Sequence, residues 1–192
     1  MSDWANFFVI VGSSGGALIG LQFVVMTLIA DGRQGTQEGA LGAFGTPTVV
    51  HLTGALVVSA IMSAPWPSRA SLSIAVGVCG AGGLVYSAIV IYRAWHQTDY
   101  EPVWQDWLWF ILLPCAVYGT LGVTSLFLRV NAPAAMFVIA GTALSLLLIG
   151  IHNAWDTVTH VLIMAAKEGR DGQDGQDGRD GQEGRDSSNQ EP

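Results

Sequence analysis

Five long apolar runs that contain no aspartate, glutamate, lysine or arginine fill most of this 192-residue chain. A helix needs about 20 residues to cross the roughly 30 Å of bilayer hydrocarbon, and most of the runs reach that length. Within lipid a single helix satisfies its own backbone hydrogen bonds, which a lone strand cannot do, so the runs predict transmembrane helices. They cover residues 5–30, 48–64, 70–92, 107–128 and 134–151, of which 48–64 is the shortest.

This pattern predicts an all-α membrane protein with five transmembrane helices in a compact bundle. The first run is longer than the apolar core of a signal peptide and follows no basic residue, so we expect a retained span. The membrane domain should occupy residues 1–166 and a disordered tail residues 167–192. We expect the spans at about 5–30, 47–64, 70–92, 107–128 and 134–166.

The C-terminal tail has low complexity. Residues 169–186 form six triplets of glycine, a polar residue and an acid. Collagen shares glycine at every third position, but these triplets lack the proline that presets the triple helix. The composition therefore predicts disorder. Residues 167–192 hold four basic and eight acidic residues, a net charge of −4, and the whole chain carries −7. Since phosphate binding needs a basic surface, we expect no nucleic-acid partner.

The distribution of basic residues predicts an orientation. Five spans put the tail on one face together with loops 31–46 and 93–106, and the N-terminus on the other. Positive charge concentrates on the cytoplasmic side of membrane proteins, so we expect the N-terminus outside and the C-terminus in the cytoplasm. The tail face carries Arg33, Arg93, Lys167, Arg170, Arg179 and Arg185, and the opposite face Arg69 and Arg129.

Small residues recur at helical spacing in the first span. Gly12, Gly16 and Gly20 are four residues apart and so lie on one helix face. Such a stripe lets another backbone approach closely, and close packing holds helices together in lipid. The stripe predicts helix packing, either within the bundle or between copies in a homo-oligomer.

Residues with metal-ligand chemistry follow the fifth apolar run. His152, Asp156 and His160 are four apart, so one helix face carries imidazole, carboxylate and imidazole. His51, one turn into the second span, falls on the same side of the membrane. These types suit zinc or another divalent metal. Three ligands over two turns are hard to bring onto one ion, so a site would combine two of them with His51, His96 or a loop acid. The alternatives are a proton-linked role and a structural polar network.

Other chemistry has little support in the sequence. There is no Walker loop, no dinucleotide-binding fingerprint and no nucleophile elbow. No charged residue lies within the apolar runs, which argues against an ion pump with a relay at the membrane midplane. We therefore predict no catalytic or cofactor-binding residues, apart from the metal hypothesis above.

Three stretches resemble a known group of proteins. They are GLQFVV at 20–25, DWLWFILLP at 106–114 and GIHNAWDTVT at 150–159. They look like the corresponding motifs of a group of small, uncharacterised bacterial multi-span integral membrane proteins. This resemblance covers the spans and not the tail. It implies a bacterial inner-membrane location and a similar number of spans, and it implies no activity.

The leading functional hypothesis is a non-enzymatic structural, accessory or channel-like component of the membrane, in contact with lipid and able to form a homo-oligomer through the first span. The first alternative is a transporter or channel for protons or small cations, with His51, His152, Asp156 and His160 at its cytoplasmic mouth. The second alternative is a metal-dependent membrane enzyme that uses the same residues.

Overall fold

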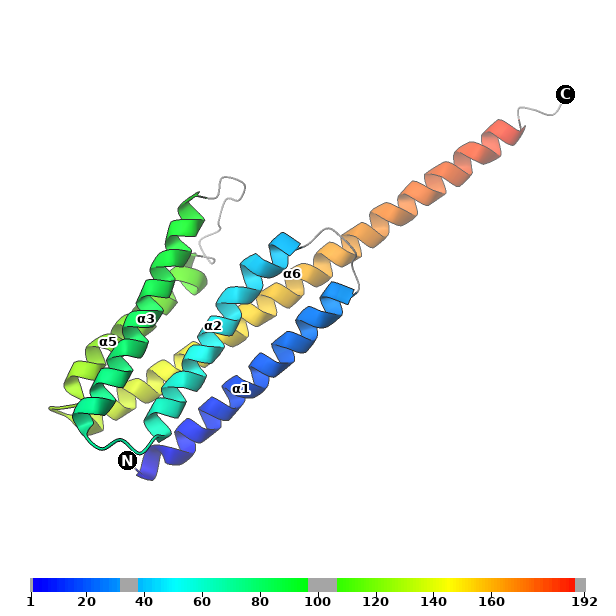
Figure 1. The fold of residues 1–192 in the computed structure, drawn as a ribbon. Helices are drawn as coiled ribbons and strands as arrows, with labels where there is room; N and C mark the ends of the chain where they lie inside the picture. The colour runs from blue at the N-terminus through cyan, green and yellow to red at the C-terminus, as the bar shows by residue number, and fades with distance from the viewer. Residues whose placement is uncertain (1, 32–37, 97–106, 189–192) are drawn as a thin grey trace. The chain divides into compact units, whose positions relative to one another are not determined.

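The computed structural model describes the backbone of residues 2–31, 38–96 and 107–188, and this backbone is helical apart from short connections (Figure 1). No strand occurs in these ranges, which confirms the all-α class. The elements are α1 (Ser2–Asp31), α2 (Glu38–Ser63), α3 (Arg69–His96), the short π-helix η1 (Leu108–Leu112), α5 (Leu113–Phe127) and α6 (Ala132–Ser188).

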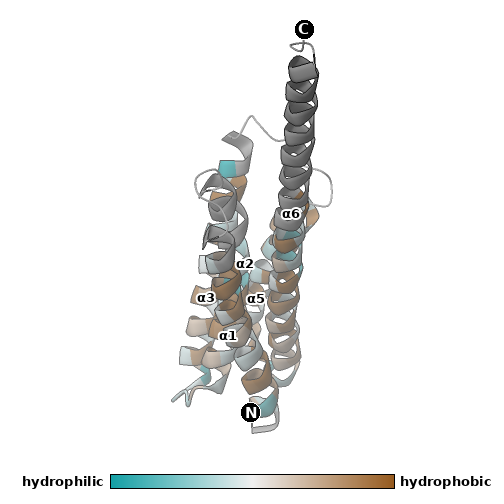
Figure 2. Cartoon of the chain, turned by 90° about the vertical axis from the view of Figure 1, so that its right-hand side faces the viewer, coloured by the Kyte–Doolittle hydropathy of each residue, from teal (hydrophilic) through white to brown (hydrophobic). Residues whose placement is uncertain are grey.

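Four helical segments in the described part of the chain are long and apolar enough to cross a membrane. They are Trp4–Thr27, Arg69–Arg93, Leu108–Phe127 and Ala132–Thr159. Hydrophobic residues recur along all of them (Figure 2). The segment Pro47–Ser63 is apolar but shorter. The structure therefore confirms a membrane-protein class and four of the expected spans as candidates, and it leaves the second span at the lower limit of length.

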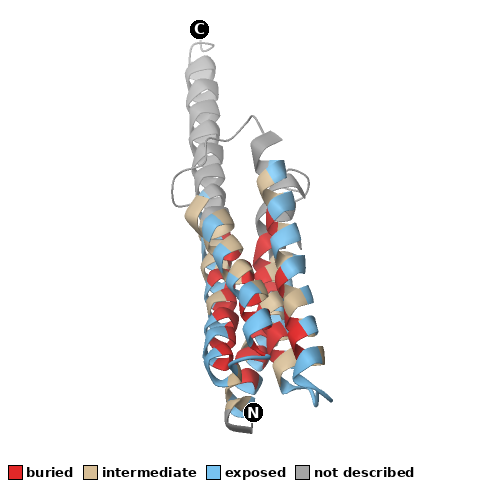
Figure 3. Cartoon of the chain, turned by 90° about the vertical axis from the view of Figure 1, so that its left-hand side faces the viewer, coloured by how far each residue is buried: buried red, intermediate tan, exposed pale blue. Residues whose placement is uncertain are grey.

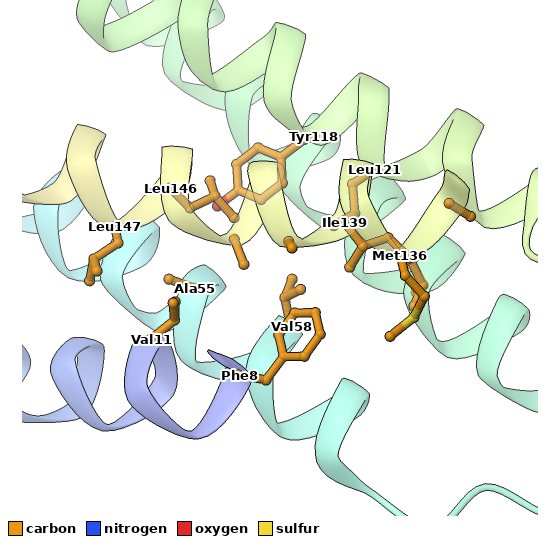
Figure 4. Close-up of a cluster of buried hydrophobic side chains, with 14 of the residues drawn as sticks. Phe8, Val11, Ala55, Val58, Tyr118, Leu121, Met136, Ile139, Leu146 and Leu147 are labelled. Carbon is orange, nitrogen blue, oxygen red and sulfur yellow. The ribbon is translucent and has the colours of Figure 1, made fainter. Parts of the chain in front are cut away.

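The chain divides into two compact units, residues 1–154 and 155–192. The first unit is a helical bundle in which α1 packs along α2 and α3 packs along α5. The first part of α6 contributes more buried residues to the core than any other helix (Figure 3). Its side chains meet those of α1, α2, α3 and α5 in one hydrophobic cluster, part of which is drawn in Figure 4. Labelled members include Phe8 and Val11 of α1, Ala55 and Val58 of α2, Tyr118 and Leu121 of α5, and Ile139 and Leu146 of α6.

Two short connections at one end of the bundle are fixed by side chains. Before α3, the Ser68 Oγ accepts a hydrogen bond from the Ser71 N–H at 3.1 Å. Before α6, the Asn131 Oδ1 accepts one from the Ala134 N–H at 3.3 Å. Both contacts satisfy backbone donors that the first turn of a helix leaves free. The residues between α2 and α3 and between α5 and α6 therefore act as short, well-defined turns.

Proline positions differ in part from what the sequence suggested. Pro47 was expected near the start of the second span, but α2 begins at Glu38 and Pro47 lies inside it. Pro114 lies in the first turn of α5, directly after the π-helical turn η1. Since proline cannot donate a backbone hydrogen bond, a break in the regular α-helical pattern at this point is physically reasonable.

The tail also differs from its expectation. The sequence predicted disorder after residue 166, whereas α6 continues through these residues to Ser188. Each glycine disfavours a helix by about 1 kcal/mol relative to alanine, which is why composition suggested disorder. The stretch up to Ser188 contains no proline, however, and it extends a helix that is already formed, so no new helix nucleus is required.

Candidate functional site

Polar side chains are buried inside the apolar bundle of residues 1–154. Polar groups in such an environment are costly unless they find hydrogen-bond partners, so their placement is informative. The buried members are Gln22, Thr48, His51, Ser59, Ser73, Ser87, Thr124, Ser125, Thr142 and Asn153. His51 is the only one of them that can carry a charge near neutral pH.

His51 lies on α2 with only 1% of its surface exposed. Its Nδ1 atom is 3.3 Å from the Tyr118 hydroxyl of α5, and the tautomer of the imidazole decides which of the two groups donates. The Tyr86 ring of α3 meets the imidazole edge-on, with ring centroids 6.2 Å apart. Three helices thus enclose one histidine, and an aromatic hydroxyl is its polar neighbour.

Tyr118 occupies a slot between two glycines. A Cβ atom added at Gly54 of α2 would lie 2.7 Å from the Tyr118 hydroxyl, and one added at Gly83 of α3 would overlap the tyrosine ring. On the same face of α3, a Cβ at Gly80 would lie 2.7 Å from the Gly122 backbone nitrogen of α5. Only glycine lets α3 and α5 approach this closely, and that approach positions Tyr118 beside His51.

The helix register places further polar residues at the level of His51. Gly15 of α1 faces Leu52 and Leu56 of antiparallel α2, so Gln22, two turns later, is level with Thr48. Gly150 of α6 faces Leu52, so Asn153, one turn later, is also near this level. We call Gln22, Thr48, His51, Tyr118 and Asn153 the polar layer. All five are at most 5% exposed, and the Gln22 Nε2 atom has no hydrogen-bond partner among the described residues.

The predicted metal ligands at the end of the fifth apolar run are only partly described. His152 is half-buried and stacks on Trp109 of η1, with ring centroids 3.7 Å apart and an interplanar angle of 27°. Asp156 is exposed, and the side chain of His160 lies outside the described residues. Since the two units meet between residues 154 and 155, the structure defines no common site for the three residues.

No group of three or more histidine, cysteine, aspartate or glutamate side chains is placed to hold one metal ion in the described part of the molecule. His51 contacts two tyrosines, and His152 contacts a tryptophan. The remaining candidates, His96 and the acids of loop 93–106, have side chains outside the described residues. The metal hypothesis is therefore still a prediction.

The glycine stripe of the first span is divided between two environments. A Cβ atom at Gly12 would lie 2.9 Å from the Ser59 Cβ of α2, so Gly12 packs inside the bundle. At Gly16 and Gly20 an added Cβ would meet no atom within 4 Å. Gly15, which the sequence stripe did not include, makes the second close contact with α2.

The bundle and its buried polar layer define an all-helical, multi-pass membrane protein. No protein-family model matches the chain, and no curated protein or solved structure matches it either. The bacterial group suggested by its motifs thus remains a resemblance, and function has to be argued from the geometry.

Proposed function

We propose that this chain is a non-enzymatic, five-span component of a bacterial inner membrane that assembles through the outer face of α1. The supporting observation is that Gly16 and Gly20 face open space and not another helix of the bundle. Large apolar side chains are exposed beside them, including Leu21, which is 61% exposed, and Val24, which is 55% exposed. Small residues flanked by larger apolar ones favour close helix pairing in lipid.

The five-span arrangement is supported by the full length of α2. This helix has 26 residues, and Glu38 at its first position is its only charged residue. At 1.5 Å per residue it measures about 39 Å, which exceeds the hydrocarbon thickness. A fifth crossing puts the two termini on opposite faces, and the basic residues then favour an outside N-terminus and a cytoplasmic C-terminus.

Assembly through α1 is tested by measuring the mass of the purified protein in detergent and by crosslinking it in membranes. We expect an oligomer that the double substitution Gly16→Leu/Gly20→Leu reduces to monomers, because leucine prevents the close approach of two α1 helices. The matched control is Gly82→Leu/Gly141→Leu, which adds the same side chains at exposed glycines of α3 and α6 that also face open space. A monomeric wild type, or an equal effect of both variants, would contradict the proposal.

The polar layer favours a second candidate, a pathway for protons or small cations. An ionisable side chain within a membrane bundle is rare and is generally functional. His51 has the Tyr118 hydroxyl beside it, and the Gln22 Nε2 atom at the same level can still donate a hydrogen bond to an incoming group. Such a layer could bind a water or pass a proton across the bundle. No comparable contact supports the other alternative, a metal-dependent enzyme.

Ion passage is tested with the protein reconstituted in vesicles that contain a pH-sensitive dye. We expect proton leak above that of empty vesicles, and we expect His51→Gln to abolish it, because glutamine cannot take up and release a proton. Thr142→Ala is the control: it removes another buried polar group, which bonds within its own helix to the Ile139 carbonyl at 2.7 Å. Vesicles no more permeable than empty ones would exclude this candidate.

A further inference from the structure

A cavity of about 490 Å³ lies at the end of the bundle where α3 and α6 begin. Three segments that are distant in the sequence form its walls: the start of α1, the connection from α2 to α3, and the start of α6. The side chains that matter for its chemistry are Trp4, Trp66, Arg69, Leu72, Pro133 and Met136. None of them belongs to the polar layer.

The aromatic walls of this cavity are held in place by contacts within the bundle. The Trp4 ring packs edge-on against Phe137 of α6, with centroids 4.7 Å apart, and against Phe7 at 5.9 Å. The Trp66 Nε1–H donates a hydrogen bond to the Ile61 carbonyl at 2.6 Å. Side chains that are already ordered lose little entropy when a ligand binds, so the cavity is preorganised.

Arg69 is the one charged side chain among the described walls of the cavity. Arg69 is exposed, and no carboxylate of the described residues forms an ion pair with it. Asp3, next to Trp4 in the sequence, has a side chain outside the described residues. The 28-residue helix α3 starts at Arg69 and α6 starts at Ala132, so the positive ends of two helix dipoles adjoin the same space. A guanidinium group near helix N-termini suits a phosphate.

The level of the cavity points to the membrane interface. The apolar segments of α3 and α6 begin at Arg69 and Ala132, so the cavity lies where the hydrocarbon gives way to headgroups. Tryptophan prefers this level of the bilayer. Leu72 and Met136 are deeper in the same cavity, where they can contact apolar parts of a ligand. One cavity thus presents a cation, aromatic rings and buried apolar side chains, which together match the groups of an anionic amphiphile.

We propose that this cavity binds the phosphate group of an anionic phospholipid. Arg69 pairs with the phosphate, Trp4 and Trp66 flank the glycerol region, and Leu72 and Met136 contact the first acyl carbons. Because every wall residue belongs to the described bundle, the site does not depend on assembly through α1 or on ion passage.

The test is native mass spectrometry of the full chain in detergent, titrated with phosphatidylglycerol or with phosphatidylcholine of the same acyl chains. We expect tighter binding of phosphatidylglycerol. Arg69→Gln should weaken it about tenfold and remove the preference, the effect of losing one hydrogen-bonded ion pair. Arg69→Lys, which keeps the charge, should retain most of the preference and shows that the fold tolerates substitution here.

The matched control is Arg129→Gln. Arg129 lies in the turn before α6 at the same end of the bundle, but it does not line the cavity. We expect this variant to bind phosphatidylglycerol as the wild type does. Equal weakening by both glutamine substitutions, or equal binding of the two lipids by the wild type, would overturn the proposal. Displacement of phosphatidylglycerol by excess inorganic phosphate would overturn the lipid assignment and give the site to soluble phosphate.

Discussion

At the scale of single residues, the contact between His51 and Tyr118 depends on one glycine of α2 and one of α3. Gly54 and Gly83 leave the space that the tyrosine ring fills, and the ring brings its hydroxyl to the imidazole. The spacing of Ala75, Cys79, Gly83 and Ser87 already marks a small-residue face on α3. Nothing in the sequence identifies Tyr118 as the residue that fills the slot.

The slot can be tested at two neighbouring glycines of α3. Gly83→Ala should destabilise the bundle by about 1–3 kcal/mol, because its methyl group overlaps the Tyr118 ring. Gly82→Ala adds the same methyl group in open space and should be neutral or stabilise by up to about 1 kcal/mol, since alanine favours a helix. Unfolding of both variants in detergent, followed by circular dichroism, measures the difference. Equal stabilities would mean that α3 and α5 are not packed as described.

At the scale of elements, α6 combines two segments with different reasons to be helical. Its residues up to Ala154 are held by the core of the bundle, with Ile139, Ala143 and Leu146 fully buried. The glycine-rich segment up to Ser188 lies in the second unit, and its sequence offers few apolar residues. Helix in this second segment therefore depends on its continuity with the first.

This dependence predicts the behaviour of a separate tail peptide. A peptide of residues 167–192 should show little helix by circular dichroism, because its six glycines disfavour a helix by about 1 kcal/mol each and nothing nucleates it. The same peptide with alanine at the six positions should be clearly helical. A strongly helical natural peptide would show that the tail needs no preceding helix.

At the scale of the whole molecule, the number of crossings decides which surfaces face the same compartment. If α2 crosses the membrane, the N-terminus and the turn at residues 128–131 share one face. If α2 does not cross, these two positions lie on opposite faces. These faces also decide on which side of the membrane the cavity beside Arg69 lies, and they can be measured without an assay of activity.

Introduced cysteines distinguish the two topologies. The variants Ser2→Cys and Asn131→Cys, in a background with Cys79 and Cys115 replaced by alanine, are labelled with a membrane-impermeant maleimide in intact cells. Five spans and an outside N-terminus predict labelling at both positions, and Ser187→Cys should react only after the membrane is opened. Labelling at one of the first two positions and not at the other would indicate four spans.

The sequence by itself determined the class of this protein. In lipid, a long run without charged residues can satisfy its own backbone hydrogen bonds only as a helix. All five runs lie in helices of the structure, apart from single residues at their ends. It also indicated where α3 and α6 begin, because the apolar runs start at residues 70 and 134, close to the observed helix starts at Arg69 and Ala132. The structure extends α2 back to Glu38 and α6 on to Ser188, beyond the expected spans, because local composition says little about the continuation of an existing helix.

Only the tertiary structure decided which residues of different helices meet. The sequence singled out His51 but could not pair it with Tyr118. It grouped Gly12, Gly16 and Gly20, of which only Gly12 has a position where an added Cβ would meet another helix. The cavity beside Arg69 is formed by three segments and has no local signature. Helix periodicity states which residues share a face, but the rotation and depth of one helix against another follow from how all the side chains fit together.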